Sequence, residues 1–441
     1  MLAFMPFFLL IVAVFMIING LDNLVRAEKI VEKVIIKKKK KSPSKEISRA
    51  KLLLKYRING GVLLALGLFL LLSFRIDISF LDNKEVTLVQ GDTAYFEEYK
   101  ETIQNYLDKN KIPGLIVGVV NGEEKALFTY GYDQLDKSGE ITAETMFEIG
   151  SITKVFTAIM LADSMTSENI SLEDTVDMYI DSSKIGTDNV FDSVTLKELT
   201  THTSGLSRLP SSFNFAFSTY IAGLTGTNPY KNLSKEEMYQ FMEDTRKLSG
   251  DQGSWEYSNY GVGILGMCLT ESRQTSYEAM LKEIITEPLG MTNTSTLYDA
   301  YEDDLYADGF RGYAALGPLK LGIKSSPWIM KEGIVAAGGI RSTGNDMLLF
   351  LDALVDRTVP SIEMTTQPLL QVDETFWMGM NFIIDRKEDS DEALIWHNGE
   401  TGGFNSYIGF YEDKDTGVFL VTNSLVNIED LAHELFLLSQ E

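Results

Sequence analysis

The order of apolar and polar positions divides the 441-residue chain into an N-terminal region with two apolar runs and a much longer C-terminal region. The run over 1–18 is unbroken and long enough to cross a hydrocarbon core. No Lys or Arg precedes it, which argues against a cleaved signal peptide. A second run, 60–74, is about 15 residues long and would span with slight local thinning of the bilayer. The pattern predicts membrane-spanning helices at 1–20 and 58–74, joined by a loop at 21–57.

This loop at 21–57 is strongly basic, with 13 basic and 4 acidic residues. The positive-inside rule places it in the cytoplasm and both chain ends outside. Nucleic-acid or anionic-lipid binding is an alternative, but a role in setting the topology is favoured. The whole chain has 39 basic and 63 acidic residues, so removing the loop's 13 and 4 leaves 26 and 59, a net charge of −33. Because such a surface repels nucleic acid, we expect no nucleic-acid partner.

After a polar linker at 75–92, the pattern predicts one large domain at 93–441. It begins with a helix at 93–110 and two strands, 114–120 and 125–132, joined through an Asn-Gly turn. From about 151 to 355 the pattern is mostly helical. Four late strands and a last helix are expected at 376–384, 393–397, 404–411, 418–422 and 429–438. Strands at both ends of a helical middle predict an α+β fold (an α/β sandwich), with an antiparallel sheet flanked by helices and an inserted helical subdomain.

The candidate chemistry centres on the stretch 147–154, FEIGSITK, in which Ser151 opens a helical run and Lys154 follows three residues later. Positions i and i+3 lie one above the other on a helix, so the Lys154 amine can reach the Ser151 hydroxyl. A partly desolvated amine can accept the serine proton and so create a nucleophile. The spacing alone is a weak signal, because Ser42 and Lys45 share it in the basic linker.

Two further motifs strengthen the signal. Tyr257 and Asn259 form a Y-x-N element before an apolar helical run, and His397 and Gly399 form an H-x-G element at a strand end. In this order, the motifs resemble those of the serine β-lactamase and penicillin-binding-protein superfamily. The chain looks most like class C β-lactamases and their carboxypeptidase and esterase relatives, from about residue 95 onward. The H-T-S-G-L sequence that starts at His202 and the Gly-rich segment at 337–343 also resemble family motifs, and the resemblance makes His202 a loop organiser rather than a base.

The resemblance implies a role for each motif residue. Ser151 would be the acylated nucleophile, Lys154 its proton acceptor and Tyr257 a proton relay, provided that the lysine shifts the phenol pKa. The backbone N–H groups of Ser151 and Glu400 would form the oxyanion hole, and Asn259 would hold Lys154 and the substrate amide. The residues expected to bind substrate are Asn259, His397, Gly399 and Glu400.

His397 is a departure from the class C pattern, which has lysine at this position to recognise a substrate carboxylate. Because histidine is only partly charged near neutral pH, this departure disfavours efficient β-lactam hydrolysis but leaves acyl-serine chemistry itself intact. Glu400 adds a negative charge that would disfavour anionic substrates. An H-x-G ending recurs among esterase-like and peptidase-like relatives, which favours those activities.

Together, these features predict a membrane-anchored, extracytoplasmic serine hydrolase of the bacterial cell envelope, with two spans in the cell membrane. It would form an acyl-enzyme on Ser151 with peptides, D-amino-acid amides or esters, as a D-Ala-D-Ala carboxypeptidase or esterase does. A class C-like β-lactamase and a catalytically weak penicillin-binding receptor or scaffold remain alternatives. The sequence has no metal signature or phosphate loop, so we expect no cofactor and no metal. The expected partners are a small peptide, ester or β-lactam substrate and the membrane; the oligomeric state stays open.

Overall fold

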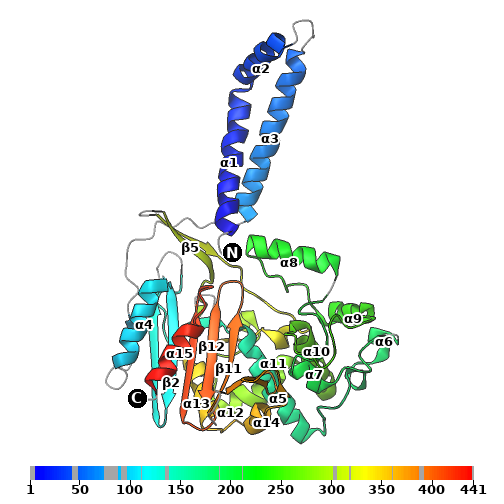
Figure 1. The fold of residues 1–441 in the computed structure, drawn as a ribbon, viewed down its shortest axis with the longest axis vertical. Coiled ribbons are helices and arrows are strands. Elements are labelled where there is room, and N and C mark those ends of the chain that lie inside the picture. The colour runs from blue at the N-terminus through cyan, green and yellow to red at the C-terminus, as the bar shows by residue number, and fades with distance from the viewer. Residues whose placement is uncertain are drawn as a thin grey trace.

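The computed structural model describes residues 5–41, 48–73, 88–90, 97–110, 112–134, 139–187, 189–210, 212–300, 305–316, 319–359, 361–386 and 392–439. A helical hairpin projects from one end of an α+β domain that contains a large sheet (Figure 1). Most of the expected linker at 75–92 lies outside the described residues. The exception is the short strand β1 (Leu88–Gln90), which pairs with the sheet of the domain.

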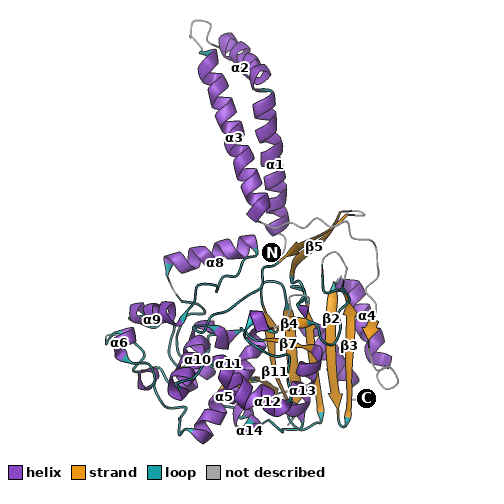
Figure 2. Ribbon diagram, turned by 180° about the vertical axis from the view of Figure 1, so that it is seen from behind, coloured by secondary structure: helices purple, strands orange, loops and turns teal. Residues whose placement is uncertain are grey.

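The hairpin is formed by α1 (Met5–Val25) and α3 (Arg49–Ser73), which lie side by side, with α2 (Ala27–Lys41) at its far end (Figures 1 and 2). A Cβ added to Gly20 would lie 2.9 Å from the Gly60 carbonyl oxygen, so the two helix backbones approach closely. Small residues permit such an approach. Both helices expose large apolar side chains, among them Phe15, Ile18, Leu54, Ile58, Val62 and Phe69.

The basic segment at 21–57 differs from the expected loop, because α2 and the first turns of α3 are helical. Lysine favours helix, and ion pairs from Arg49 to Glu32 at 3.4 Å and from Arg57 to Glu28 at 4.0 Å join the two helices. Within the described part of the chain, one helix, Arg49–Phe69, is long and apolar enough to cross a membrane, and Val12–Val25 is a shorter apolar helix. Among the described residues, the second expected span, 58–74, overlaps the longer helix in part, and the first, 1–20, overlaps the shorter one, so two spans are not confirmed.

The sheet confirms the expected antiparallel core built from both ends of the domain. Within the described residues it has nine strands in the order β1-β3-β2-β13-β12-β11-β10-β9-β8, and each neighbouring pair is antiparallel. Thr422 of β13 pairs with Leu115 of β2, which joins the first and last parts of the domain directly. The strands after β1 are β2 (Gly114–Asn121), β3 (Glu124–Gly131), β8 (Leu370–Gln371), β9 (Phe376–Met378), β10 (Ile383–Arg386), β11 (Ala393–Glu400), β12 (Asn405–Tyr411) and β13 (Thr416–Thr422).

Alternating side chains of these strands enter two separate cores, because successive side chains of a strand point to opposite faces. Leu115 and Val117 of β2 belong to the core beneath α4 (Glu97–Asn110) and α15 (Glu429–Leu438). Ile116, between them, belongs to the larger core that contains α5 (Thr153–Ser167) and α13 (Gly344–Val355). The α+β fold, with helices against an antiparallel sheet, is therefore confirmed.

The middle of the chain forms the inserted helical part. Its helices, with those that flank it, are α5 (Thr153–Ser167), α6 (Ser182–Ile185), α7 (Leu196–Thr200), α8 (Phe213–Thr225), α9 (Lys235–Asp244), α10 (Asn259–Arg273), α11 (Tyr277–Leu281), α12 (Glu287–Leu289), α13 (Gly344–Val355) and α14 (Ile362–Thr366). Two small sheets were not expected there: β4 (Met146–Glu148) pairs with β7 (Arg341–Thr343), and β5 (Phe310–Leu316) with β6 (Leu319–Lys324). The single strand expected at 376–384 is also two strands, β9 and β10, because Asn381 turns the chain with φ 53°.

Candidate active site

Ser151 lies just before α5, and its segment packs against the C-terminal end of β11. It belongs to a 3-10 turn, Gly150–Ile152, that leads into α5. Gly150 has φ +53°, and a Cβ on it would lie 2.8 Å from the Glu400 backbone nitrogen. Only glycine adopts this conformation without strain and allows the strand so near. Ser406 Oγ donates to the Ile149 carbonyl oxygen at 2.8 Å and fixes the same approach from β12.

Lys154 lies in the first turn of α5 and is completely buried. Its Nζ lies 2.9 Å from Ser151 Oγ and donates to the Ala337 carbonyl oxygen at 2.5 Å. Burial lowers the Lys154 pKa well below its usual value, and the positive charge of Arg208 lowers it further. The amine is therefore biased toward the neutral form, which can accept the serine proton.

Tyr257 packs against this pair, with its ring centroid 4.9 Å from Lys154 Nζ. Burial raises the pKa of the phenol, and a hydrogen bond with Ser151 and the charge of Arg208 lower it by less. The expected shift toward ionisation does not occur, because burial of the phenol outweighs the effects that lower its pKa. In the free site the phenol is therefore a proton donor.

Asn259 is the first residue of α10, and its Nδ2 donates to Tyr230 Oη at 3.4 Å. Its Oδ1 is buried without a hydrogen-bond partner in the described structure. The expected contact with Lys154 is not among the described hydrogen bonds of that lysine, which go to Ser151 and Ala337. The amide is instead held beside Tyr230 at the cavity wall.

His397 differs most from its expected role as a partly charged group. The side chain is only 1% exposed, and its Nδ1 donates to the Asn398 carbonyl oxygen at 2.5 Å. Burial, with a smaller effect of Lys154, lowers the His397 pKa to about 3, so the imidazole is neutral near pH 7. It does not line the cavity beside Ser151, whereas its neighbour Asn398 does.

Gly399 and Glu400 are the last two residues of β11. A Cβ on Gly399 would lie 2.1 Å from the Ile149 carbonyl oxygen, so glycine is needed for β11 to pass. Glu400 lines the cavity, and desolvation raises its pKa while Arg208 lowers it. Both residues thus lie against the segment that carries Ser151.

His202, expected to organise its loop, is buried behind Tyr257. Its ring centroid lies 4.5 Å from that of Tyr257, and its Nδ1 accepts from the Ser258 backbone N–H at 3.3 Å. Its carbonyl oxygen accepts from the Glu256 N–H at 2.8 Å. His202 therefore fixes both residues that flank the tyrosine in sequence.

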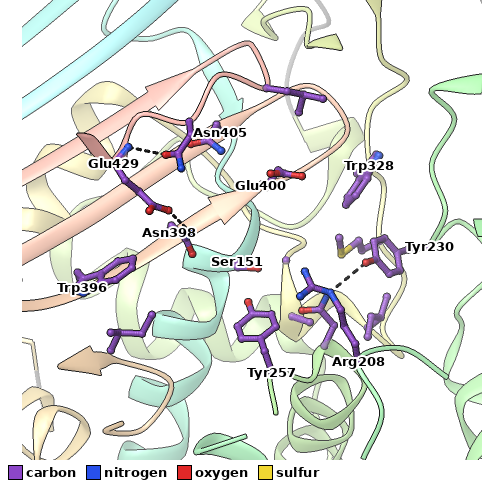
Figure 3. Close-up of a pocket in the computed structure, with 18 of the residues that line it drawn as sticks. Ser151, Arg208, Tyr230, Tyr257, Trp328, Trp396, Asn398, Glu400, Asn405 and Glu429 are labelled. Carbon is purple, nitrogen blue, oxygen red and sulfur yellow. Dashed lines mark hydrogen bonds between the residues drawn. The ribbon is translucent and has the colours of Figure 1, made fainter. Parts of the chain in front are cut away.

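A cavity of about 470 Å³ opens over Ser151 (Figure 3). Arg208, Tyr230 and Trp328 lie on one side of the serine, and Trp396, Asn398 and Glu429 on the other. The described lining residues are Ser151, Arg208, Tyr230, Trp255, Tyr257, Asn259, Trp328, Met330, Ile334, Ala337, Gly338, Phe376, Ile383, Trp396, Asn398, Glu400, Asn405, Leu425, Asn427 and Glu429. Among these described lining residues, Arg208 is the single arginine or lysine and so carries the fixed positive charge.

Sequence reasoning missed Arg208. Its guanidinium carbon lies 5.1 Å from the Tyr257 ring centroid, and the described residues give the guanidinium no hydrogen bond or ion pair. Its carbonyl oxygen accepts from the backbone N–H groups of Asn259 at 3.0 Å and Tyr260 at 3.2 Å, which ties it to the start of α10. Its position two residues after the H-T-S-G-L motif was the only available signal.

A serine hydroxyl beside a buried, neutral-biased lysine, at the end of an interior sheet strand, is the site of a serine hydrolase. The chain belongs to the beta-lactamase family, whose model matches residues 99–439, and with it to the serine β-lactamase and penicillin-binding-protein-like superfamily. A beta-lactamase of Escherichia coli (strain K12) is 23% identical over 358 residues, which cover 73% of this chain and 87% of that protein.

Solved structures agree with this assignment. The octameric penicillin-binding protein homologue from Pyrococcus abyssi has a TM-score of 0.66 at 26% identity, and the match covers 79% of this chain and 78% of the other. A class C beta-lactamase has a TM-score of 0.65 at 21% identity, with coverage of 78% and 98%. The second comparison supports the fold.

Proposed function

We propose that this serine hydrolase forms an acyl-enzyme on Ser151 and acts on peptides, D-amino-acid amides or esters of the cell envelope. One observation carries the proposal: Lys154 Nζ lies 2.9 Å from Ser151 Oγ, in a place that disfavours the charged amine. A solvated, protonated lysine has no lone pair with which to accept a proton. Burial of Lys154 therefore prepares it to act as a general base.

Acylation would start when Ser151 Oγ attacks the substrate carbonyl carbon and its proton moves to Lys154 Nζ. The carbonyl oxygen becomes an oxyanion, which the backbone N–H groups of Ser151 and Glu400 would stabilise. The close approach of Gly150 to the Glu400 nitrogen supports this pairing. Collapse of the tetrahedral intermediate breaks the bond to the leaving group and leaves an ester on Ser151.

Tyr257 would supply the proton that the departing amine or alkoxide needs. Its raised pKa keeps the phenol protonated, and its hydrogen bond with Ser151 places it beside the reacting bond. The lysine can then return the serine proton to the phenolate. In deacylation, the same groups would accept a proton from the attacking water, which releases the acid and restores Ser151.

Arg208 supplies the fixed positive charge that the neutral His397 does not. Its guanidinium faces a cavity lined with Tyr230 and Trp328, and no described protein group pairs with its donors. A guanidinium matches a planar carboxylate with two parallel hydrogen bonds. We therefore infer that the substrate carries a carboxylate, which also favours class C-like β-lactam hydrolysis as the second candidate.

The chain would be anchored in the cell membrane by two spans, 1–20 and 58–74, around a cytoplasmic segment at 21–57. The linker 75–92 would carry the hydrolase domain, 93–441, outside the cytoplasm. The apolar side chains exposed along α1 and α3 support this topology, since large exposed apolar surfaces are rare in soluble proteins. The basic character of α2 supports its cytoplasmic side.

Covalent labelling tests the nucleophile. The wild type should gain the mass of one fluorophosphonate or one penicillin in intact-mass spectra, and Ser151→Ala should gain neither. Lys154→Ala should acylate at least about a hundredfold more slowly, the usual scale for loss of a positioned base. Thr166→Ala, on the same helix and away from the cavity, is the control. Labelling of Ser151→Ala at the wild-type rate would place the nucleophile elsewhere.

A further inference from the structure

The chain leaves the cavity at Arg208 and returns to it at Tyr230, and the stretch between them, 209–229, contains no charged residue. At the chain's average of 23% charged residues, a stretch of this length would hold about five. The surrounding domain is strongly acidic, so the absence of charge is local. A segment exposed to water would normally contain some Asp, Glu, Lys or Arg.

Most of this stretch is the helix α8. Ser212 Oγ accepts from the Phe215 N–H at 3.1 Å and caps its start, and Gly226, with φ 74°, ends it. Phe217 is 57% exposed and Tyr220 is 60% exposed. Surface helices of soluble domains normally present charged side chains on the outer face. The outer face of α8 presents aromatic side chains instead.

The position of α8 coincides with the base of the hairpin. Figures 1 and 2 show α8 lying across the end of the domain from which α1 and α3 project, with its axis crosswise to theirs. It contacts α1. If α1 and α3 enter a bilayer, a helix in this position lies in the plane of its surface.

Hydrogen bonds connect α8 firmly to the cavity wall. The Gly226 carbonyl oxygen accepts from the Ser326 N–H at 2.8 Å, and Asn228 Nδ2 donates to the Ile329 carbonyl oxygen at 2.6 Å. Between these two anchors lies Trp328, which lines the cavity and packs edge-on against Tyr230 with ring centroids 5.1 Å apart. The C-terminal end of α8 is therefore joined to this side of the cavity through Gly226 and Asn228.

We propose that α8 docks in the interface of the bilayer that anchors the chain, with Phe217 and Tyr220 among the lipid headgroups. Helices in the membrane plane bury aromatic and aliphatic side chains at the headgroup boundary, and tyrosine favours that layer. The inference rests on the membrane anchor of the proposed function. Docking holds the Arg208 and Tyr230 side of the cavity at the membrane surface, within reach of substrates attached to lipid.

Site-directed spin labelling of the full chain in lipid nanodiscs tests the proposal. Tyr220→Cys reports on α8, Val62→Cys on α3, and Leu437→Cys, 62% exposed on α15, is the matched control on a different surface. Cys268 is completely buried, so the label attaches to the introduced thiol. The Tyr220 and Val62 labels should relax faster with oxygen than with a water-soluble nickel chelate, and the Leu437 label the reverse.

Each pattern of results has one meaning, because fluorophosphonate labelling of every variant shows that its site has folded. A Val62 label accessible mainly to nickel would overturn the membrane anchor and the inference with it. A Val62 label in lipid together with a Tyr220 label as accessible to nickel as that on Leu437 would overturn the docking of α8 alone. The acyl-enzyme proposal depends on neither label.

Discussion

Replacement of Arg208 by glutamine should remove the recognition of substrate charge while leaving the nucleophile in place. The side chain lines the cavity, and the Arg208 carbonyl oxygen accepts hydrogen bonds from the start of α10. The described residues give the guanidinium no hydrogen bond or ion pair. Glutamine keeps a similar length and hydrogen-bonding capacity but has no charge. The change therefore tests charge rather than shape.

The size of the effect follows from the environment of the guanidinium. A hydrogen bond to a charged group contributes about 1.5–3 kcal/mol, which corresponds to roughly ten- to 150-fold in kcat/KM. Arg208 is an exposed residue, and solvent screens its charge, so we expect the lower part of that range, about tenfold. The loss should appear mainly in KM if the pair forms equally in the ground and transition states.

The assay compares matched substrates that differ only in charge. The first pair has either thioglycolate, which is charged, or thioglycolamide, which is neutral, as the leaving group. The second pair consists of p-nitrophenyl esters whose acyl group is either succinyl, with a free carboxylate, or succinyl with that carboxylate blocked as a methyl ester. In the wild type, the charged member of at least one pair should be preferred, and Arg208→Gln should reduce that preference about tenfold. Arg208→Lys should retain part of it, because a lysine keeps the charge but loses the bidentate geometry.

The control is Lys247→Gln, which removes one exposed positive charge outside the cavity and should not change the preference. An equal loss on charged and neutral members of both pairs would refute carboxylate recognition. Arg208 would then act through Lys154 and Tyr257, whose pKa values its charge lowers. A wild type without any preference would refute the reasoning directly.

Two further predictions concern His397 and Gly150. The folded His397 pKa is lowered to about 3, so the stability that its neutral imidazole contributes is complete above about pH 6.5 and is lost as pH falls toward 3. Between pH 6 and 4, the free energy of unfolding of the wild type, measured in urea melts, should therefore fall by up to about 1.4 kcal/mol per pH unit more than that of His397→Gln. An unchanged slope would show that the imidazole is not held neutral. Gly150→Ala should slow acylation about a hundredfold in intact-mass time courses, whereas Gly290→Ala, with φ +72° and open space around it, should leave acylation unchanged; equal rates in the two variants would contradict the close approach to Glu400.

The sheet was predictable because its strands repeat with period two and end in recognisable turns. The expected helix at 429–438 coincides with α15, and the expected strands at 114–120 and 418–422 fall within β2 and β13. The β5–β6 hairpin was missed because its residues lie in a long region dominated by helical patterns. The break between β9 and β10 depends on a positive φ at Asn381, which local hydrophobicity does not indicate.

In the site, local spacing indicated more than long-range environment. The i, i+3 relation between Ser151 and Lys154 places their side chains 2.9 Å apart, even though Ser151 lies in a 3-10 turn. The charge state of His397 could not be read from its motif, because it results from burial by other segments and from Lys154. Arg208 was missed for the same reason, since its place at the cavity comes from backbone bonds to α10.

The electrostatic link between Arg208 and Lys154 connects substrate binding to catalysis. In the free site, the guanidinium charge lowers the Lys154 pKa in addition to the larger effect of burial. A substrate carboxylate that pairs with Arg208 would neutralise that charge, and the Lys154 pKa would rise. A neutral amine with a higher pKa is a stronger base, so proton transfer from Ser151 becomes more favourable when a charged substrate is bound. Pairing of the substrate carboxylate with Arg208 would thus select the substrate and also remove the effect by which the arginine charge weakens Lys154 as a base.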